Sequence, residues 1–282
     1  MYFLSEDINM SNFIHFGCWN NLNEGNRLKK VMSSIKRRLA DDNQPVIDFI
    51  SIAGDNYYPH KEKDKEDKNK KNVTKDKKDK KTKMGKKKNI YTQLLTDGFD
   101  LLPKKTDIFM ILGNHDLETN TNIDKPSLYV DNVPEKDCRI LKTEYGVTQS
   151  QRNVEFVLFK ELLMQNENVV LMIDTSMYTM DAEKYVSCYN TFLNTNYSLD
   201  QLQNFQKDFI QTSIQNNENK MRNLIIIGHH PITGIKIKDT KPRLLNDIPR
   251  FVDVLKTIFE VLKNDVNYYY LCADLHLYQS GT

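Results

Sequence analysis

Asp, Asn and His side chains recur directly after short apolar runs at four places in this 282-residue sequence. The apolar runs are Val46 to Ala53, Ile108 to Leu112, Leu224 to Ile227 and Tyr268 to Cys272. The motifs that follow them are Gly54-Asp55-Asn56-Tyr57-Tyr58, Gly113-Asn114-His115-Asp116, Gly228-His229-His230-Pro231 and Ala273-Asp274-Leu275-His276. Side chains just past the carboxyl ends of successive strands gather at one edge of a sheet. This set of oxygen and nitrogen donors suits a pair of hard or borderline metal ions.

The sequence around the motifs predicts the elements that position them. A first strand is expected from Asn12 to Phe16, and a helix from Arg27 to Ala40, where apolar residues recur at intervals of three and four. Further helices are expected from Asp200 to Ile214, with Ser198 as its N-cap, and from Phe251 to Leu262. Strands that alternate with helices predict a sheet with helices packed against it.

The motifs resemble those of the calcineurin-type metallophosphoesterases, and most of all those of the purple acid phosphatase branch. GDNYY is similar to that branch's GDNFY, GNHD is identical, GHHP is similar to GHYP, and YLCADLHLYQ is similar to YLCGHDHNLQ. Phe16-Gly17-Cys18-Trp19-Asn20 resembles its GDWG, and Met172-Ile173-Asp174-Thr175 resembles its strand ending in LDT. The resemblance implies an α/β fold, a four-layer α/β/β/α sandwich. We expect its second sheet to be incomplete, because the sequence stops six residues after His276.

The resemblance also implies a centre of two metal ions, iron with iron, zinc or manganese. In that family a bridging hydroxide attacks the phosphorus of a phosphomonoester. Asp55 would be the bridging carboxylate, and Tyr58 and His276 would bind the first ion. Asn114 and His229 would bind the second ion.

Three neighbours of these ligands gain a role from the same resemblance. His115 would be a catalytic histidine that does not bind metal, acting beside Asn114. Asp116 would support the ligands from outside the centre. His230 replaces the tyrosine of GHYP, so the sequence leaves its role open.

Cys18 and Asp274 stand where the family has other ligands. Cys18 replaces the aspartate of GDWG, and Asp274 replaces the first histidine of the last motif. Both residue types bind metal, since a thiolate suits zinc or iron and a carboxylate suits manganese, magnesium or iron. The alternatives are that Cys18 is a small buried hydrophobic residue and that Asp274 is a turn residue. We predict that both are ligands.

Charge is spread unevenly over the chain. The stretch from Lys61 to Lys88 holds 15 lysines and 6 acidic residues, so it carries +9 and leaves −7 for the rest of a chain with net charge +2. We predict a single domain over residues 11–282, a ten-residue N-terminal extension, and a disordered insert over residues 61–89. The alternative is that the insert binds a polyanion or an acidic partner at the rim of the site.

The remaining composition predicts a cytoplasmic protein that does not enter a membrane. The four cysteines form no CxxC pair, which favours reduced thiols. Neither a signal peptide nor an apolar run of about 20 residues is present.

Three functions follow from these observations. The first is a metal-dependent phosphomonoesterase with a phosphorylated substrate of unknown identity. The second is a binding or scaffold protein, in which the altered ligands Cys18 and Asp274 have abolished turnover. The third is a phosphodiesterase acting on nucleic acid or nucleotides, with Lys61 to Lys88 holding the polyanion.

Overall fold

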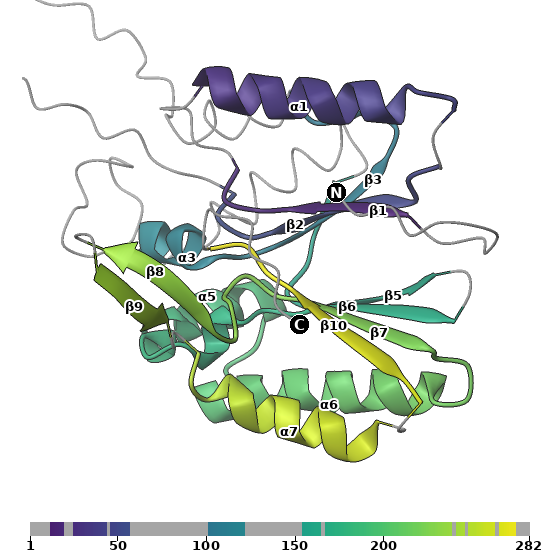
Figure 1. Cartoon of the computed structure of the whole chain (residues 1–282). Coiled ribbons are helices and arrows are strands. Elements are labelled where there is room, and N and C mark those ends of the chain that lie inside the picture. The colour runs from purple at the N-terminus through teal and green to yellow at the C-terminus, as the bar shows by residue number, and fades with distance from the viewer. Residues whose placement is uncertain are drawn as a thin grey trace, which may run out of the picture.

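The computed structural model has two β-sheets that face each other, with helices on the outer face of each sheet (Figure 1). This is the four-layer α/β/β/α arrangement that the sequence predicted. The structure describes residues 12–19, 25–43, 46–56, 101–121, 154–164, 167–238, 241–245, 248–262 and 265–274.

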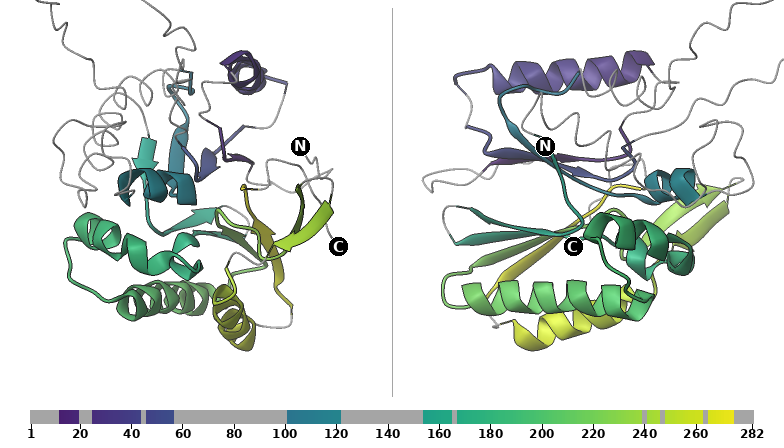
Figure 2. Two further views of the ribbon diagram at one scale, coloured as in Figure 1. Left: turned by 90° about the vertical axis from the view of Figure 1, so that its left-hand side faces the viewer. Right: turned by 180° about the vertical axis from the view of Figure 1, so that it is seen from behind.

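The first sheet is wholly parallel and has the strand order β1-β2-β3-β4. Helix α1 covers its outer face, as the two views in Figure 2 also show. The elements are β1 (Phe13–Phe16), α1 (Gly25–Leu39), β2 (Phe49–Ala53), β3 (Asp107–Ile111) and β4 (Val154–Phe156).

The second sheet has the order β10-β7-β6-β5, in which β5 alone runs antiparallel to its neighbour. Helices α6 and α7 cover its outer face (Figure 1). The elements are β5 (Lys160–Met164), β6 (Asn168–Met172), α6 (Leu199–Asn217), β7 (Asn223–Ile227), α7 (Phe251–Val261) and β10 (Asn267–Leu271). Among the described residues, β10 forms one edge of this sheet.

Each buried strand divides its side chains between two apolar layers, because successive side chains of a strand point to opposite faces. In β2, Phe49 and Ala53 belong to a cluster that joins the two sheets, with Met172 and Ile227 on the other side. The alternate residues of β2 belong to the larger cluster that includes the helices. Strands covered on both faces are therefore continuously apolar.

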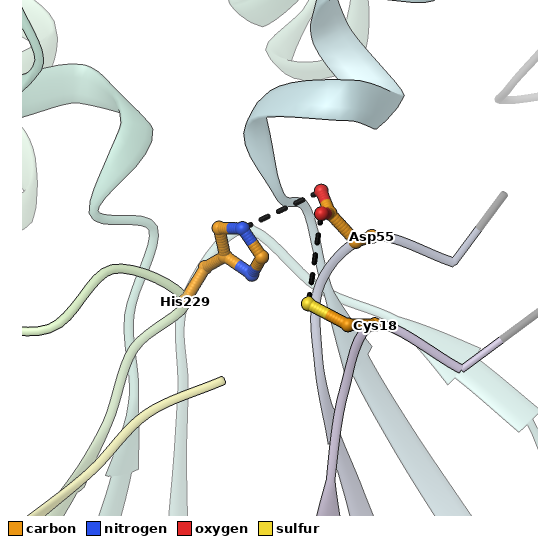
Figure 3. A group of neighbouring side chains, drawn as sticks. All are labelled: Cys18, Asp55 and His229. Carbon is orange, nitrogen blue, oxygen red and sulfur yellow. Dashed lines mark hydrogen bonds and ion pairs between the residues drawn. The ribbon is translucent and has the colours of Figure 1, made fainter. Parts of the chain in front are cut away.

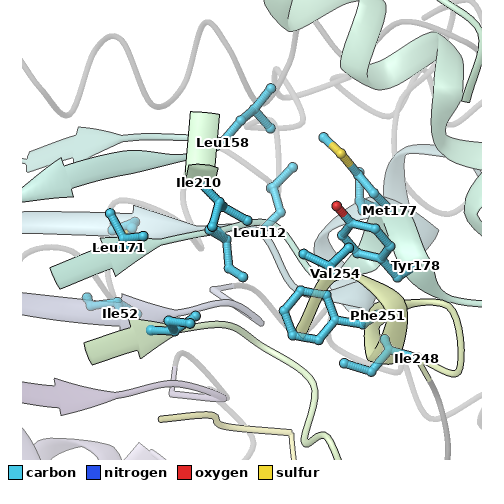
Figure 4. Packing of buried hydrophobic residues seen from close by; sticks show 14 of the residues in the cluster. Ile52, Leu112, Leu158, Leu171, Met177, Tyr178, Ile210, Ile248, Phe251 and Val254 are labelled. Carbon is cyan, nitrogen blue, oxygen red and sulfur yellow. The ribbon is translucent and has the colours of Figure 1, made fainter. Parts of the chain in front are cut away.

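The larger cluster continues onto the helices of the second sheet. Figure 4 shows Phe251 and Val254 of α7 beside Met177 and Tyr178. The rings of Tyr178 and Phe251 lie 5.2 Å apart. This packing fixes the turn after β6 against the outer helices.

Shorter elements complete the described chain. They are α3 (Asn114–Thr121), η3 (Ser176–Tyr178), η4 (Ala182–Tyr185), α5 (Val186–Leu193) and an antiparallel hairpin of β8 (Gly234–Lys238) and β9 (Lys241–Leu245). Figure 1 places α3, α5 and this hairpin at the same end of the sandwich.

The predicted strands and helices are confirmed, with ends shifted by up to three residues. Ser198 is the N-cap of α6, and its side chain and that of Gln201 form a capping box. The strand predicted from Val46 begins only at Phe49, which is the residue that pairs with the first residue of β1. Val46 itself is 80% exposed.

One expectation about the cysteines is wrong. Cys188 is disulfide-bonded, whereas Cys18 and Cys272 form no disulfide. Spacing along a sequence does not reveal which cysteines meet in space, which is why the pairing was missed. A cytoplasmic location therefore loses the support of reduced thiols and stays a prediction.

No helix in the described part of the chain is long and apolar enough to cross a membrane.

Candidate metal centre

The carboxyl ends of strands from both sheets meet at one place. Within the first sheet, the backbone N–H of Cys18, after β1, donates to the carbonyl of Gly54, after β2, at 3.0 Å. Within the second sheet, the N–H of Ala273, after β10, donates to the carbonyl of His229, after β7, also at 3.0 Å. Each bond fixes two turns that carry predicted ligands relative to each other.

Asp55 lies at the centre of this region with both carboxylate oxygens in use (Figure 3). Its Oδ2 lies 3.6 Å from Sγ of Cys18, and its Oδ1 lies 3.4 Å from Nε2 of His229. One ligand atom from each of these three residues falls within 4.8 Å of the other two. Asp55 and His229 are completely buried, whereas Cys18 is half-buried.

Two more predicted ligands face the same nitrogen of His229. Oδ1 of Asn114 lies 3.0 Å from Nε2, and Oδ1 of Asp274 lies 3.9 Å from it. On the other side of the ring, Nδ1 lies 2.7 Å from the carbonyl of Ala53, which can only accept a hydrogen bond. Nδ1 therefore carries the proton of a neutral ring, and Nε2 presents a lone pair.

This arrangement brings several acceptors together. The lone pair on Nε2 of His229 faces the oxygens of Asp55, Asn114 and Asp274, which are themselves acceptors. A bound cation would satisfy these acceptors together. Carboxylate, amide, imidazole and thiol groups are all metal-ligand types, so the residues present fit a bound metal ion.

The backbone at the centre is strained. Cys18, Asp55 and Asp274 have φ angles of 50°, 52° and 37°, three of the five positive values among the described non-glycine residues. Such conformations cost on the order of 1–3 kcal/mol each and persist where the surrounding structure imposes them. All three lie at strand ends and point their side chains into one site.

Helix α3 holds the carboxylate of Asp55 in place by a hydrogen bond. The N–H of His115, in its first turn, donates to Oδ1 of Asp55 at 3.0 Å. The carboxylate of Asp116 accepts from the N–H of Gly113 at 2.9 Å and from the backbone and side chain of Asn56 at 2.9 and 3.0 Å. Burial, together with the charge of Asp55, raises the pKa of Asp116 to about 8. Asp116 thus joins the two turns that carry Asp55 and Asn114.

A β-carbon at Gly113 would lie 2.3 Å from Oδ1 of Asp55 and 2.4 Å from its backbone nitrogen. A side chain at this position would therefore push α3 away from Asp55. The second motif therefore requires glycine at this position, because its backbone lies so close to Asp55.

Thr175, after β6, holds the turn that carries His229 and His230. Its hydroxyl oxygen accepts from the N–H of His229 at 3.2 Å and from the N–H of His230 at 3.0 Å. It also lies 2.9 Å from Nδ1 of His230. Burial lowers the pKa of His230 well below its ordinary value, and the nearby His229 contributes to this. The ring is therefore neutral, and the hydroxyl donates to Nδ1.

Tyr270 of β10 clamps the same turn from the other side, because its hydroxyl donates to the carbonyl of His230 at 2.7 Å. The sequence left the role of His230 open, and the structure gives it contacts to Thr175 and Tyr270. Neither of these two contacts was predicted. The signals for Thr175 were its place just past an apolar strand and the resemblance of Met172 to Thr175 to the family's strand ending in LDT.

The structure thus brings together Cys18, Asp55, Asn114, His229 and Asp274, with Asp116 and the backbone of His115 beside them. Tyr58, His276 and the lysine-rich stretch from Lys61 to Lys88 lie outside the described residues. Their roles stay predictions.

Comparison with known families agrees with this fold. A model of the calcineurin-like phosphoesterase family matches residues 11–278, nearly the whole chain, so the chain belongs to that family. The chain therefore belongs to a family whose activity is metal-dependent hydrolysis of phosphoesters. No curated protein sequence matches the chain.

Proposed function

We propose that the chain hydrolyses phosphomonoesters at a centre of two metal ions built around Asp55, in the manner of the purple acid phosphatases. The observation that carries this proposal is the division of the Asp55 carboxylate between two groups of donors. Oδ2 faces the sulfur of Cys18, while Oδ1 faces His229. A carboxylate with a different set of ligands on each oxygen is what a bridge between two ions requires.

The residues of the chain then divide into two subsites. Cys18 and Oδ2 of Asp55 belong to the first subsite, to which the resemblance also assigns Tyr58 and His276. The second subsite is formed by Oδ1 of Asp55 and by the side chains of Asn114, His229 and Asp274. Metal ions bound there, iron with iron, zinc or manganese, would supply an activated water and neutralise charge on the phosphate.

His115 is our candidate for the proton donor to the departing alcohol. It follows the ligand Asn114 in the first turn of α3, and its backbone is fixed by the hydrogen bond to Asp55. Its side chain is half-buried, as a group that must reach substrate should be. The first turn of a helix also favours an anion such as phosphate.

A second candidate is a binding protein without turnover. It is favoured by the two replaced ligands, since Cys18 and Asp274 change the charge of the ligand set. Under this alternative, the double substitution Cys18→Asp with Asp274→His should create turnover that the natural chain lacks. A phosphodiesterase that holds a polyanion through Lys61 to Lys88 is the third candidate, and it requires salt-dependent binding that disappears when the stretch is deleted.

The test begins with the metal content of protein purified without chelators. Two ions per chain are expected, together with hydrolysis of p-nitrophenyl phosphate that a chelator abolishes and added metal restores. Faster hydrolysis of bis(p-nitrophenyl) phosphate would instead favour the phosphodiesterase. Two ions without turnover of either compound would favour the binding protein, and no bound metal would contradict the proposed centre.

A further inference from the structure

We infer that the two subsites prefer different metals, and that Cys18 makes its own subsite a thiolate site for a soft ion of the zinc class. This inference rests on the proposed function. It concerns a position where this chain departs from the resembled family, and it makes the centre chemically asymmetric.

The surroundings of Cys18 differ from those of a core cysteine. Cys188, which is disulfide-bonded, is fully buried within the large apolar cluster. Cys18 is half-buried, and its sulfur lies 3.6 Å from Oδ2 of a buried carboxylate. A thiol placed against Asp55 and near His229 belongs to a group of ligand atoms and not to an apolar layer.

The backbone fixes the sulfur in this position. The N–H of Cys18 donates to the carbonyl of Gly54, so the residue is tied to the turn that carries Asp55. A β-carbon at Gly17 would lie 2.5 Å from Cβ of Ala273 and 2.7 Å from the carbonyl oxygen of Ala53. The chain is therefore pressed against both sheets just before Cys18, which fixes the backbone of Cys18 beside Asp55.

The donors of the two subsites differ in kind. Cys18 supplies the only sulfur in the cluster formed by the described residues, on the Oδ2 side of Asp55. The Oδ1 side has the amide of Asn114, the ring of His229 and the carboxylate of Asp274. Thiolates select zinc and similar soft ions, whereas carboxylate and carbonyl oxygens suit manganese and magnesium. A mixed pair of ions is the expected occupancy.

Cobalt(II) is the probe that tests the inference, because thiolate bound to cobalt absorbs in the near ultraviolet by charge transfer. The full-length chain is stripped of metal and titrated with cobalt(II) while the bound ions are counted. We expect this absorption in the natural chain and in Cys272→Ser, the matched control that removes the thiol of the other described cysteine that forms no disulfide. We expect it to vanish in Cys18→Ser.

A competition experiment measures the preference itself. The chain is loaded from a mixture of zinc and manganese, and the ratio of the two bound ions is determined. In Cys18→Asp, which keeps a ligand at the position, zinc should be disfavoured against manganese by about tenfold or more relative to the natural chain. Melting of the metal-free variants shows whether each one is folded.

Two results would overturn the inference, and they are distinguishable. Two cobalt ions that bind with the same spectrum in the natural chain and in Cys18→Ser would exclude the thiolate while leaving the proposed function intact. Failure of the natural chain to bind any ion would overturn the inference and the proposed function together.

Discussion

Two buried aspartates, Asp55 and Asp174, each lie two residues past a buried strand, yet their surroundings differ. Oδ1 of Asp174 accepts from the backbone N–H groups of Ser176 at 2.7 Å and Met177 at 3.3 Å, and from the hydroxyl of Tyr189 at 3.0 Å. Asp55 has a left-handed backbone, and its carboxylate faces a thiol and an imidazole in addition to one backbone N–H. The first carboxylate organises a turn, whereas the second is held among ligand atoms.

The difference shows how one strand end can serve structure and another serve chemistry. Asp174 fixes the turn that begins η3. The hydroxyl of the next residue, Thr175, binds the backbone of the turn that carries His229. Burial raises the pKa of Asp174 to about 7. Asp55 takes strained backbone geometry to present both oxygens to other side chains. Each prediction below separates these two roles.

The largest effect is expected for Asp55→Asn, which keeps the shape of the side chain and removes its charge. Loss of a partner outside a metal's ligand set typically costs 10–100-fold, so loss of the central carboxylate should cost about 10³-fold or more in turnover. Bound metal should fall below two ions per chain. Elemental analysis and phosphatase kinetics on the purified variant provide the measurement.

Asp174→Asn is the matched control for this first prediction, since it makes the same chemical change in the other buried aspartate. It should retain two ions per chain, because Asn keeps an oxygen for the N–H groups of Ser176 and Met177. If Asp174→Asn lost its metal while Asp55→Asn kept it, the assignment of the two roles would be wrong.

The parts of this molecule that the sequence could predict are those set by local patterns. Apolar runs such as Leu224 to Ile227 predict strands, and apolar spacing predicts helices, because burial follows the period of each element. The motif residues were found because each directly follows such a run. Their order along the chain also indicated the family to which the chain belongs.

The contacts that cross from one part of the chain to another could not be predicted in this way. The hydroxyl of Thr175 reaches backbone groups 54 and 55 residues away, and Nδ1 of His229 reaches a carbonyl 176 residues away. Such distances depend on how two sheets face each other, which no local pattern encodes. Left-handed backbone at Cys18, Asp55 and Asp274 is equally hidden, because non-glycine residues seldom adopt it.

The second prediction concerns stability, and it uses the raised pKa of Asp174. Because the pKa of about 7 in the folded protein lies above the ordinary value of 3.8, the folded state keeps a proton that the unfolded chain has lost. The stabilisation of the folded state by this proton is fully present below about pH 4 and is lost as the pH rises to about 7. At 1.36 kcal/mol per pH unit, the loss between pH 5 and pH 8 should be about 2–3 kcal/mol.

Asp174→Asn should remove this pH dependence. The free energy of unfolding of the variant should therefore fall less between pH 5 and pH 8 than that of the natural chain. Denaturant unfolding of both metal-free proteins at the two pH values gives the comparison. The difference between the two proteins in the pH dependence of the free energy of unfolding cancels the effect of groups that both share, such as Asp116, whose pKa is also raised. Parallel pH profiles for the two proteins would show that Asp174 is ionised throughout and is not the proton-binding group.

The smallest effect is expected at Thr175, which links the two regions. Its hydroxyl accepts two N–H groups of the His229 turn and donates to Nδ1 of His230. Thr175→Val keeps the shape and removes all three bonds, so the buried N–H groups lose their acceptor. Thr175→Ser keeps the hydroxyl and serves as the matched variant.

Metal affinity of the valine variant should fall by about 10–100-fold, because His229 loses the support that orients it, and the serine variant should recover most of that loss. Competition with a chelator measures the affinity, and melting of the metal-free proteins measures the structural cost separately. A hydroxyl that only packed the interior would lower the melting temperature and leave metal affinity unchanged. Equal metal affinity in the valine and serine variants would therefore contradict the inference that the hydroxyl of Thr175 supports metal binding at Asp55.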